Sequence, residues 1–279
     1  MAPVPVASST ALLVLNNQLG FRDNSVFGPD SSTPNYGANI AALLSAFRET
    51  SSKLSEGSRP LVIHVQYRPV WTDHPLHESK HGPFGQNAEE VRAIDFLEFA
   101  APRKWTPEGF ELVYSIDEVR RPKHKDAPAL PDEIIMSTHG HNPFINSPLE
   151  SILNKRGIKT LLVCGMQTDV SVSSVVRTAQ NLALTGKFGG RGNMADASLG
   201  ERWTDGASVF VEAKEDAPEG ERGEDGLAVE MARIILIQDA TRSFGKGGLD
   251  AETVQRVHVE SLKEFAEVWN TSDVLAAFQ

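Results

Sequence analysis

The stretch Leu161-Leu162-Val163-Cys164-Gly165-Met166-Gln167-Thr168-Asp169-Val170-Ser171-Val172 decides how the rest of the chain is interpreted. Its continuous apolar run predicts a strand buried on both faces, and Gly165 predicts a tight turn after that strand. The residues that follow predict the first turn of a helix, which places Ser171 at a helix N-terminus. Free backbone N–H groups and the positive end of the helix dipole favour developing negative charge there. The stretch therefore predicts an anion-stabilising site with a hydroxyl group at its centre.

Three other apolar runs have the same continuous character, at residues 11–15, 60–65 and 233–237, and residues 133–137 form a weaker candidate. Helical patterns separate these runs, at residues 40–54, 147–156, 254–265 and 272–278. Strands that alternate with helices predict a three-layer α/β fold with a mostly parallel sheet and helices on both faces. Ligands bind beyond the carboxyl ends of the strands in such sheets, so we expect residues 16–18, 66–68 and 165–171 to converge.

We expect residues 1–279 to form a single domain that two segments interrupt. Residues 67–131 are rich in Pro, His and aromatic residues and show only one short helical pattern, around 88–99. Such a long segment near a strand end predicts a lid or specificity loop. Residues 186–228 are rich in Gly and then in acidic residues, a composition typical of a mobile surface insertion.

Composition limits the classes of partner. The net charge of −10 comes from 27 basic and 37 acidic residues, which disfavours nucleic acids and anionic membranes as partners. No apolar run approaches the roughly 20 residues that span a bilayer, and the start of the chain lacks the basic segment of a signal peptide. A single cysteine excludes an internal disulfide and fits a reducing compartment, so we expect a cytoplasmic protein.

Three stretches resemble motifs of one known family. Residues 15–18 read Leu-Asn-Asn-Gln and are followed by Phe21, residues 142–144 read Asn-Pro-Phe, and residues 164–172 form the most specific of the three. Together they resemble the isochorismatase-like cysteine hydrolases, which include isochorismatases, nicotinamidases, N-carbamoylsarcosine amidases and ureidoacrylate hydrolases. The resemblance implies the fold predicted above, and it implies a catalytic Asp, Lys and Cys. This chain has Asn16, Thr138 and Ser171 at those positions.

The three replacements change the chemistry that this site can perform. The Asn16 amide cannot accept the proton of a nucleophile, and the Ser171 hydroxyl has almost no anionic form near pH 7 without an adjacent base. Loss of the Lys at position 138 removes a cation that would favour a thiolate or an oxyanion. The resemblance also implies that isochorismatases protonate a vinyl ether through the Asp and hold the substrate with a Gln, here Gln66. Asn16 cannot donate a proton as a carboxylic acid does.

Two histidines flank the position of the missing Lys, and either could act as acid or base near neutral pH. We take Asn16, Thr138, His139 and Ser171 as the catalytic candidates. The candidates for substrate contacts lie after strand ends or in the predicted lid; they are Gln18, Phe21, Gln66, Arg68, Trp71, His141 and Gln167. Ser171 could be a nucleophile, a hydrogen-bonding group or a small residue that fills the site, and the histidines could simply be solvated.

A cluster of Asp73, His74, His77 and His81 has spacing like that of metal ligands. The resemblance implies a metal near this region in nicotinamidases, but their ligands directly follow the second strand, where this chain has Gln66, Tyr67 and Arg68. We therefore favour solvated loop histidines, and we expect no metal and no cofactor.

Two functions from different classes remain open. In one, the protein is an enzyme that acts on a small organic molecule by hydrolysis, or by acid/base-assisted lyase, isomerase or cyclase chemistry. In the other, it is an inactive relative that binds a ligand or a partner. The resemblance also implies a homodimer or a higher homo-oligomer.

Overall fold

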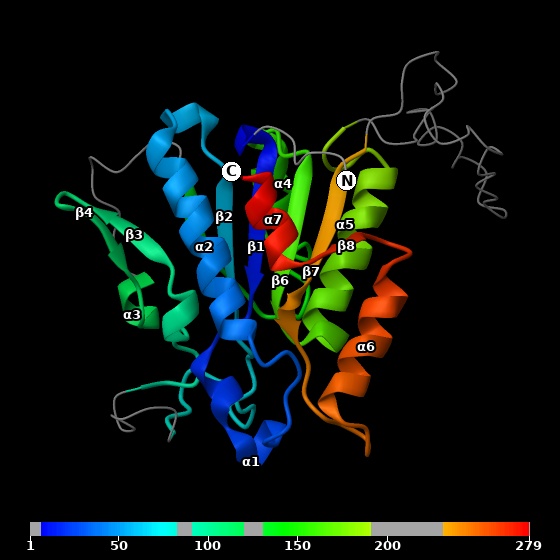
Figure 1. Ribbon diagram of the computed structural model, residues 1–279. Helices are drawn as coiled ribbons and strands as arrows, with labels where there is room; N and C mark the ends of the chain where they lie inside the picture. Colours follow the sequence, from blue (N-terminus) through cyan, green and yellow to red (C-terminus); the bar gives the residue numbers. More distant parts are fainter. Residues whose placement is uncertain (1–6, 83–90, 120–130, 191–230, 279) are drawn as a thin grey trace, which may run out of the picture.

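A computed structural model describes residues 7–82, 91–119, 131–190 and 231–278. Six parallel strands form the main sheet in the order β5-β2-β1-β6-β7-β8 (Figure 1). They are β1 (Thr10–Leu15), β2 (Leu61–Tyr67), β5 (Glu133–Thr138), β6 (Thr160–Met166), β7 (Arg233–Arg242) and β8 (Glu267–Trp269). Strands β1, β2 and β6 are buried along their whole length, as strands covered by helices on both faces must be. The predicted fold class is confirmed, and the weak candidate at 133–137 is a strand.

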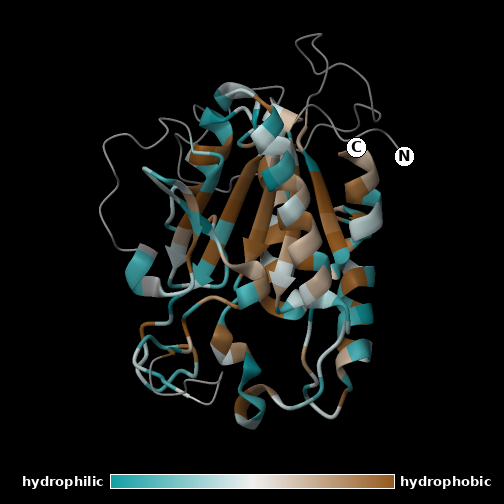
Figure 2. Ribbon diagram, turned by 60° about the vertical axis from the view of Figure 1, so that its left-hand side comes forward, coloured by the Kyte–Doolittle hydropathy of each residue, from teal (hydrophilic) through white to brown (hydrophobic). Residues whose placement is uncertain are grey.

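Helices cover both faces of this sheet. Helices α2 (Tyr36–Lys53) and α7 (Thr271–Ala277) pack on one face, where Ile40, Phe47 and Val274 contact the sheet. Helices α4 (Leu149–Lys155), α5 (Ser173–Leu184) and α6 (Ala251–Leu262) pack on the other. Figure 2 shows the apolar strands between helices whose outer sides are polar. No helix in the described ranges combines the length and apolar character that crossing a bilayer requires.

The described part of the predicted lid segment differs from the sequence prediction. Strands β3 (Arg103–Thr106) and β4 (Gly109–Leu112) form an antiparallel hairpin, and a short helix α3 (Ile116–Val119) follows. The helix predicted around 88–99 is wrong for residues 91–97, which form turns before a single 3₁₀ turn at Glu98–Ala100. Their backbone groups bond to the loop after β1 instead, because Asp95 O accepts from Leu19 N. Residues 191–230, most of the predicted acidic insertion, lie outside the described residues.

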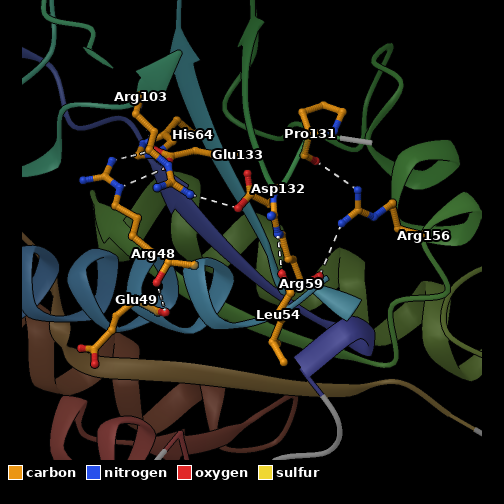
Figure 3. A network of polar contacts seen from close by, with 11 residues as sticks. Arg48, Glu49, Leu54, Arg59, His64, Arg103, Pro131, Asp132, Glu133 and Arg156 are labelled. Atoms are coloured by element: carbon orange, nitrogen blue, oxygen red, sulfur yellow. Dashed lines mark hydrogen bonds and ion pairs between the residues drawn. The ribbon is translucent and has the colours of Figure 1, made fainter. Parts of the chain in front are cut away.

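A buried ionic network joins α2, β2, β3 and β5 (Figure 3). Glu133 is 8% exposed, and its carboxylate lies 2.6 Å from Arg48 Nη2, 2.8 Å from His64 Nε2 and 2.8 Å from Arg103 Nε. Burial alone would raise the pKa of Glu133, but the hydrogen bonds and charges of His64 and Arg48 outweigh it and lower this pKa to about 2. The network therefore holds a charged carboxylate at the start of β5 and fastens the hairpin to the sheet.

We predict that Glu133→Gln lowers the free energy of unfolding at pH 7 by about 3 kcal/mol, because it leaves Arg48 without its buried counter-charge and leaves Arg103 with Asp132 alone. The folded pKa of Glu133 lies below its unfolded value of about 4.5. The contribution is thus complete above pH 4.5 and is lost as the pH falls toward 2. Urea titrations of both proteins between pH 7 and pH 3 should show the difference shrinking with acid. Glu49→Gln, at an exposed pair with Lys53, is the control and should have little effect at any pH.

Gly165 lets β6 approach β1 more closely than any other residue could. Its φ is +135°, and a Cβ atom at this position would lie 2.3 Å from Leu15 O and 2.6 Å from Leu15 N. Both are backbone atoms of the central strand, which cannot move aside. The tight turn predicted at Gly165 is wrong, because this residue lies within β6, where its close approach brings the ends of two strands together.

Gly165→Ala should destabilise the protein by more than about 2 kcal/mol, because it adds a backbone clash to an unfavourable φ. Gly157→Ala is a matched control: Gly157 also has positive φ (+61°), but nothing lies within 4 Å of the added Cβ. It should cost only about 1 kcal/mol. Chemical denaturation of both variants checks the difference, and equal losses would contradict the role given to the Leu15 contact.

Candidate active site at the strand ends

The carboxyl ends of β1, β2, β5 and β6 meet at one edge of the sheet, as predicted. Asn16 directly follows β1 with φ +55°, and its backbone N–H donates to Val65 O of β2. Ser171 lies in a π-helical turn (Thr168–Val172) that leads into α5. Such turns often occur at functional sites because they displace one side chain from the regular helical position.

Ser171 makes side-chain hydrogen bonds with two groups from distant parts of the chain. Asn16 Nδ2 donates to Ser171 Oγ over 2.8 Å. His141 Nδ1 lies 3.2 Å from the same oxygen. Because the Asn16 bond uses the oxygen as acceptor, the hydroxyl proton is free to point at His141. Ser171 is 0% exposed and Asn16 is 2% exposed, so the group is enclosed.

Burial favours the neutral form of His141, which can accept a proton. It is half-buried, and its ring lies 4.5 Å from the Tyr67 ring between centroids. Burial lowers the pKa of His141 below its usual 6.5. The imidazole is therefore neutral at pH 7, and Nδ1 can accept the Ser171 proton when Nε2 carries the ring hydrogen.

Asn142 fixes the loop that carries His141. Its Nδ2 atom donates to Thr178 Oγ1 over 2.7 Å and to Ser174 Oγ over 3.0 Å, both on α5. Its Oδ1 atom accepts from the backbone N–H of Phe144. Since Ser171 leads into the same helix, this anchor sets the position of His141 relative to Ser171.

The other two catalytic candidates lie beside this group without a side-chain hydrogen bond to Ser171. Thr138 ends β5 and donates its hydroxyl to Gly140 O over 2.8 Å, so it shapes the turn. His139 is exposed, and its Nδ1 atom lies 2.7 Å from Arg68 O. The histidine that the structure brings to Ser171 is therefore His141, which we had placed among the substrate contacts.

The remaining substrate candidates fall into separate positions. Gln18 and Gln66 are fully buried and bond to backbone, Gln18 to both the N–H and the C=O of Tyr67 and Gln66 to Ile94 O. Arg68 forms an ion pair with Glu78, and Trp71 is 62% exposed. Phe21 lines a cavity on another side of the strand ends. Gln167 has φ +63°, and its buried Oε1 atom has no hydrogen-bond partner among the described residues.

No three His, Cys, Asp or Glu side chains of the described ranges are placed to hold a metal ion together. In the cluster of Asp73, His74, His77 and His81, His74 Nδ1 accepts from Leu76 N, and His77 Nδ1 lies 2.8 Å from Ser79 Oγ. Asp169 pairs with Lys246 at the start of the π-helical turn. Cys164 is fully buried within β6, and burial raises its pKa, so it stays a thiol.

Two groups of this site had no catalytic assignment from the sequence. Tyr67 is named in the sequence analysis only as a neighbour of Gln66 and Arg68, and Asn142 only as part of a resembling turn. Both act on His141 rather than on Ser171, so neither has a motif of its own. An Asn one residue after a histidine, followed by Pro, does signal a turn, but it gives no indication of the helix that the turn contacts.

The sheet, its helices and this strand-end site define a three-layer α/β domain, and comparisons with known proteins give its family. Residues 10–185, more than half of the chain, match the family model described as the isochorismatase domain. The chain therefore belongs to the isochorismatase family, which confirms the resemblance.

Solved structures agree on the fold. One is a putative hydrolase of the isochorismatase family from Chromobacterium violaceum, with a TM-score of 0.60, 19% identity and coverage of 100% of this chain and 98% of that chain. Another is a cysteine hydrolase from Pseudomonas syringae, with a TM-score of 0.55, 18% identity and coverage of 100% and 95%. An isochorismatase from Pseudomonas putida has a TM-score of 0.52, 18% identity and coverage of 98% and 93%.

We predict that His141 titrates below pH 6.5, because its half-buried ring pays more to become charged than a solvated ring does. Two-dimensional NMR of the ring protons, assigned with a His141→Gln variant, measures the midpoint. A histidine in a short unstructured peptide is the reference. A midpoint at or above that of the peptide would contradict the placement of His141 in this enclosed group.

Proposed function

We propose that this protein is a hydrolase that cleaves a small ester or amide, with Ser171 as nucleophile and His141 as its base. The observation that carries the proposal is the pair of contacts on Ser171 Oγ, one from Asn16 Nδ2 and one from His141 Nδ1. A serine needs an adjacent base within hydrogen-bond reach, and a neutral histidine is the usual one. His141 thus replaces the base that Asn16 cannot provide.

The groups support a two-step acyl transfer. Ser171 Oγ attacks the substrate carbonyl while its proton moves to His141 Nδ1, which forms a tetrahedral oxyanion and an imidazolium. The imidazolium then protonates the leaving alcohol or amine, which departs and leaves an acyl ester on Ser171. A water molecule next gives its proton to His141 Nδ1 and attacks the ester, and the proton returns to Ser171 Oγ as the acid product leaves.

Asn16 and the start of α5 favour this reaction electrostatically. The Asn16 amide donates to Ser171 Oγ, so it stabilises negative charge as the proton leaves. Ser171 lies in the first turn of a helical stretch that runs on through the twelve residues of α5, where the positive dipole end stabilises an oxyanion. The missing Lys cation is thus partly replaced by neutral donors. Lyase, isomerase or cyclase chemistry would also use His141, but the contact between Asn16 and Ser171 favours a nucleophile.

The enclosure of Ser171 favours a second candidate function, that of a binding protein without catalytic activity. The Ser171 side chain is 0% exposed, so a substrate reaches it only if the loop that carries His141 moves. A site that never opens would make the protein an inactive relative that binds a ligand or partner elsewhere. The two candidates differ in whether Ser171 reacts with a small electrophile.

A fluorophosphonate probe tests this difference without knowledge of the natural substrate. We expect the probe to label Ser171 in the wild-type protein, with the adduct located by peptide mass spectrometry. Ser171→Ala should abolish the labelling, and His141→Gln should slow it by at least about 100-fold because proton transfer is lost. The rate should fall as the pH drops through the lowered pKa of His141, since protonated His141 cannot act as base.

His139→Gln is the matched control, because His139 lies two residues away on the same loop but contacts Arg68 O instead. Its labelling rate should stay within about threefold of wild type, a difference too small for a lost general base. Ser171 that stays unlabelled after prolonged exposure of folded protein would overturn the proposed hydrolase in favour of the binding protein. Equal losses in His139→Gln and His141→Gln would contradict the assignment of His141.

A further inference from the structure

A cavity of about 330 Å³ lies beside the strand ends, on the side where the loop after β1 meets the end of β7. Its lining is mixed. The apolar side consists of Phe21, Leu97, Phe99, Met166 and Phe244, and the charged groups are Arg242 and Arg22, which pairs with Glu98. Neither Asn16 nor Ser171 lines it. A cavity at the low end of the roughly 300–1,000 Å³ typical of small-molecule sites can enclose one small ligand.

Arg242 is a half-buried cation whose contacts in the described residues are neutral. Its Nε and Nη2 atoms donate to Ser32 O and Thr33 O over 3.0 and 2.9 Å, and its guanidinium lies 4.8 Å from the Tyr36 ring centroid. No carboxylate of the described residues pairs with it, and its Nη1 group makes no hydrogen bond to them. Burial lowers the pKa of Arg242 below its usual value, yet the group stays charged at neutral pH.

This arginine is held rigidly. Ser32 O and Thr33 O fix two edges of the guanidinium, and Tyr36 covers a face of it. Tyr36 is itself fully buried and donates its hydroxyl to Asn17 Oδ1 over 2.6 Å. A guanidinium that is already ordered loses little conformational entropy when it binds a planar anion.

Aromatic rings form the apolar side of the cavity. Phe21 and Phe244 stack with their ring planes 9° apart and centroids 5.8 Å apart, and Phe27 packs against both. These rings present an apolar surface next to the cation. The cavity thus places an aromatic surface next to the Arg242 guanidinium.

We propose that this cavity binds a small carboxylate with an aromatic or other apolar body, the carboxylate on Arg242 and the body against Phe21 and Phe244. Charge supports a carboxylate, because Arg242 lines the cavity and no carboxylate of the described residues pairs with its guanidinium. Geometry supports it as well, because a guanidinium fork matches two carboxylate oxygens.

The cavity and the Ser171 group are neighbours but separate sites. The backbone links them, because Gln167 N donates to Arg242 O over 2.8 Å, four residues before Ser171. The carboxylate proposal does not depend on Ser171 being a nucleophile. Ser171→Ala should therefore bind the carboxylate as the wild type does, even if the hydrolase proposal fails.

Isothermal titration of the full-length protein with 3-phenylpropionate and with 3-phenylpropanamide tests the proposal. These probes share the apolar body and differ in charge, so we expect the acid to bind at least tenfold more tightly. Arg242→Gln should weaken the acid at least tenfold and leave the amide nearly unchanged. Arg177→Gln is the matched control, because Arg177 is also half-buried with its guanidinium over an aromatic ring, 4.3 Å from Phe265. It should bind the acid as the wild type does.

Ser31→Trp provides an independent variant, because Ser31 lines the cavity and a large side chain there fills it while Arg242 stays in place. It should lose both probes, and circular dichroism should show that the variant is folded. Equal affinity for acid and amide would overturn the proposal, as would absence of binding at millimolar concentrations. If Arg242→Gln fails to fold, unchanged affinity in folded Ser31→Trp overturns it as well.

Discussion

The close approach of the β6 backbone to β1 at Gly165 is the constraint on which the site depends. It brings the two strand ends together, so that Asn16 after β1 and Ser171 after β6 meet across 155 positions of sequence. The left-handed backbone of Asn16 and Gln167 continues the same arrangement, because each strand must turn sharply as it leaves the sheet. Close pairing of the strands thus brings together polar side chains that are far apart in the sequence.

Much of the fold could be predicted because its strands are continuous apolar runs that only a doubly covered sheet accommodates. Strand β8 could not, since Glu267–Trp269 has three residues and its alternation is too short to be distinguished from a loop. The β3–β4 hairpin was missed for another reason. Its strands are mostly exposed or half-buried, and ion pairs such as Arg103 with Glu133 hold it in place rather than an apolar pattern.

Only the site residues that belong to a recognisable motif could be predicted from the sequence. Asn16 and Ser171 follow from the ends of two recognisable strands, but His139 and His141 lie two residues apart in a loop with no periodicity. Which imidazole faces Ser171 depends on Asn142, whose contacts to α5 are tertiary. Arg242 was missed because the apolar run predicted β7 only to residue 237, whereas the strand continues to 242 and its end belongs to the cavity.

The enclosure of Cys164 has a consequence for the chemistry that the cell or the laboratory can apply to this protein. It is the one cysteine in the sequence, it is fully buried inside β6, and burial disfavours its thiolate. Alkylating agents and peroxides act on exposed thiolates, so they have no target in the folded protein that resembles a nucleophilic cysteine. The buried Cys164 thiol is therefore protected from the oxidation to which an exposed thiolate is vulnerable.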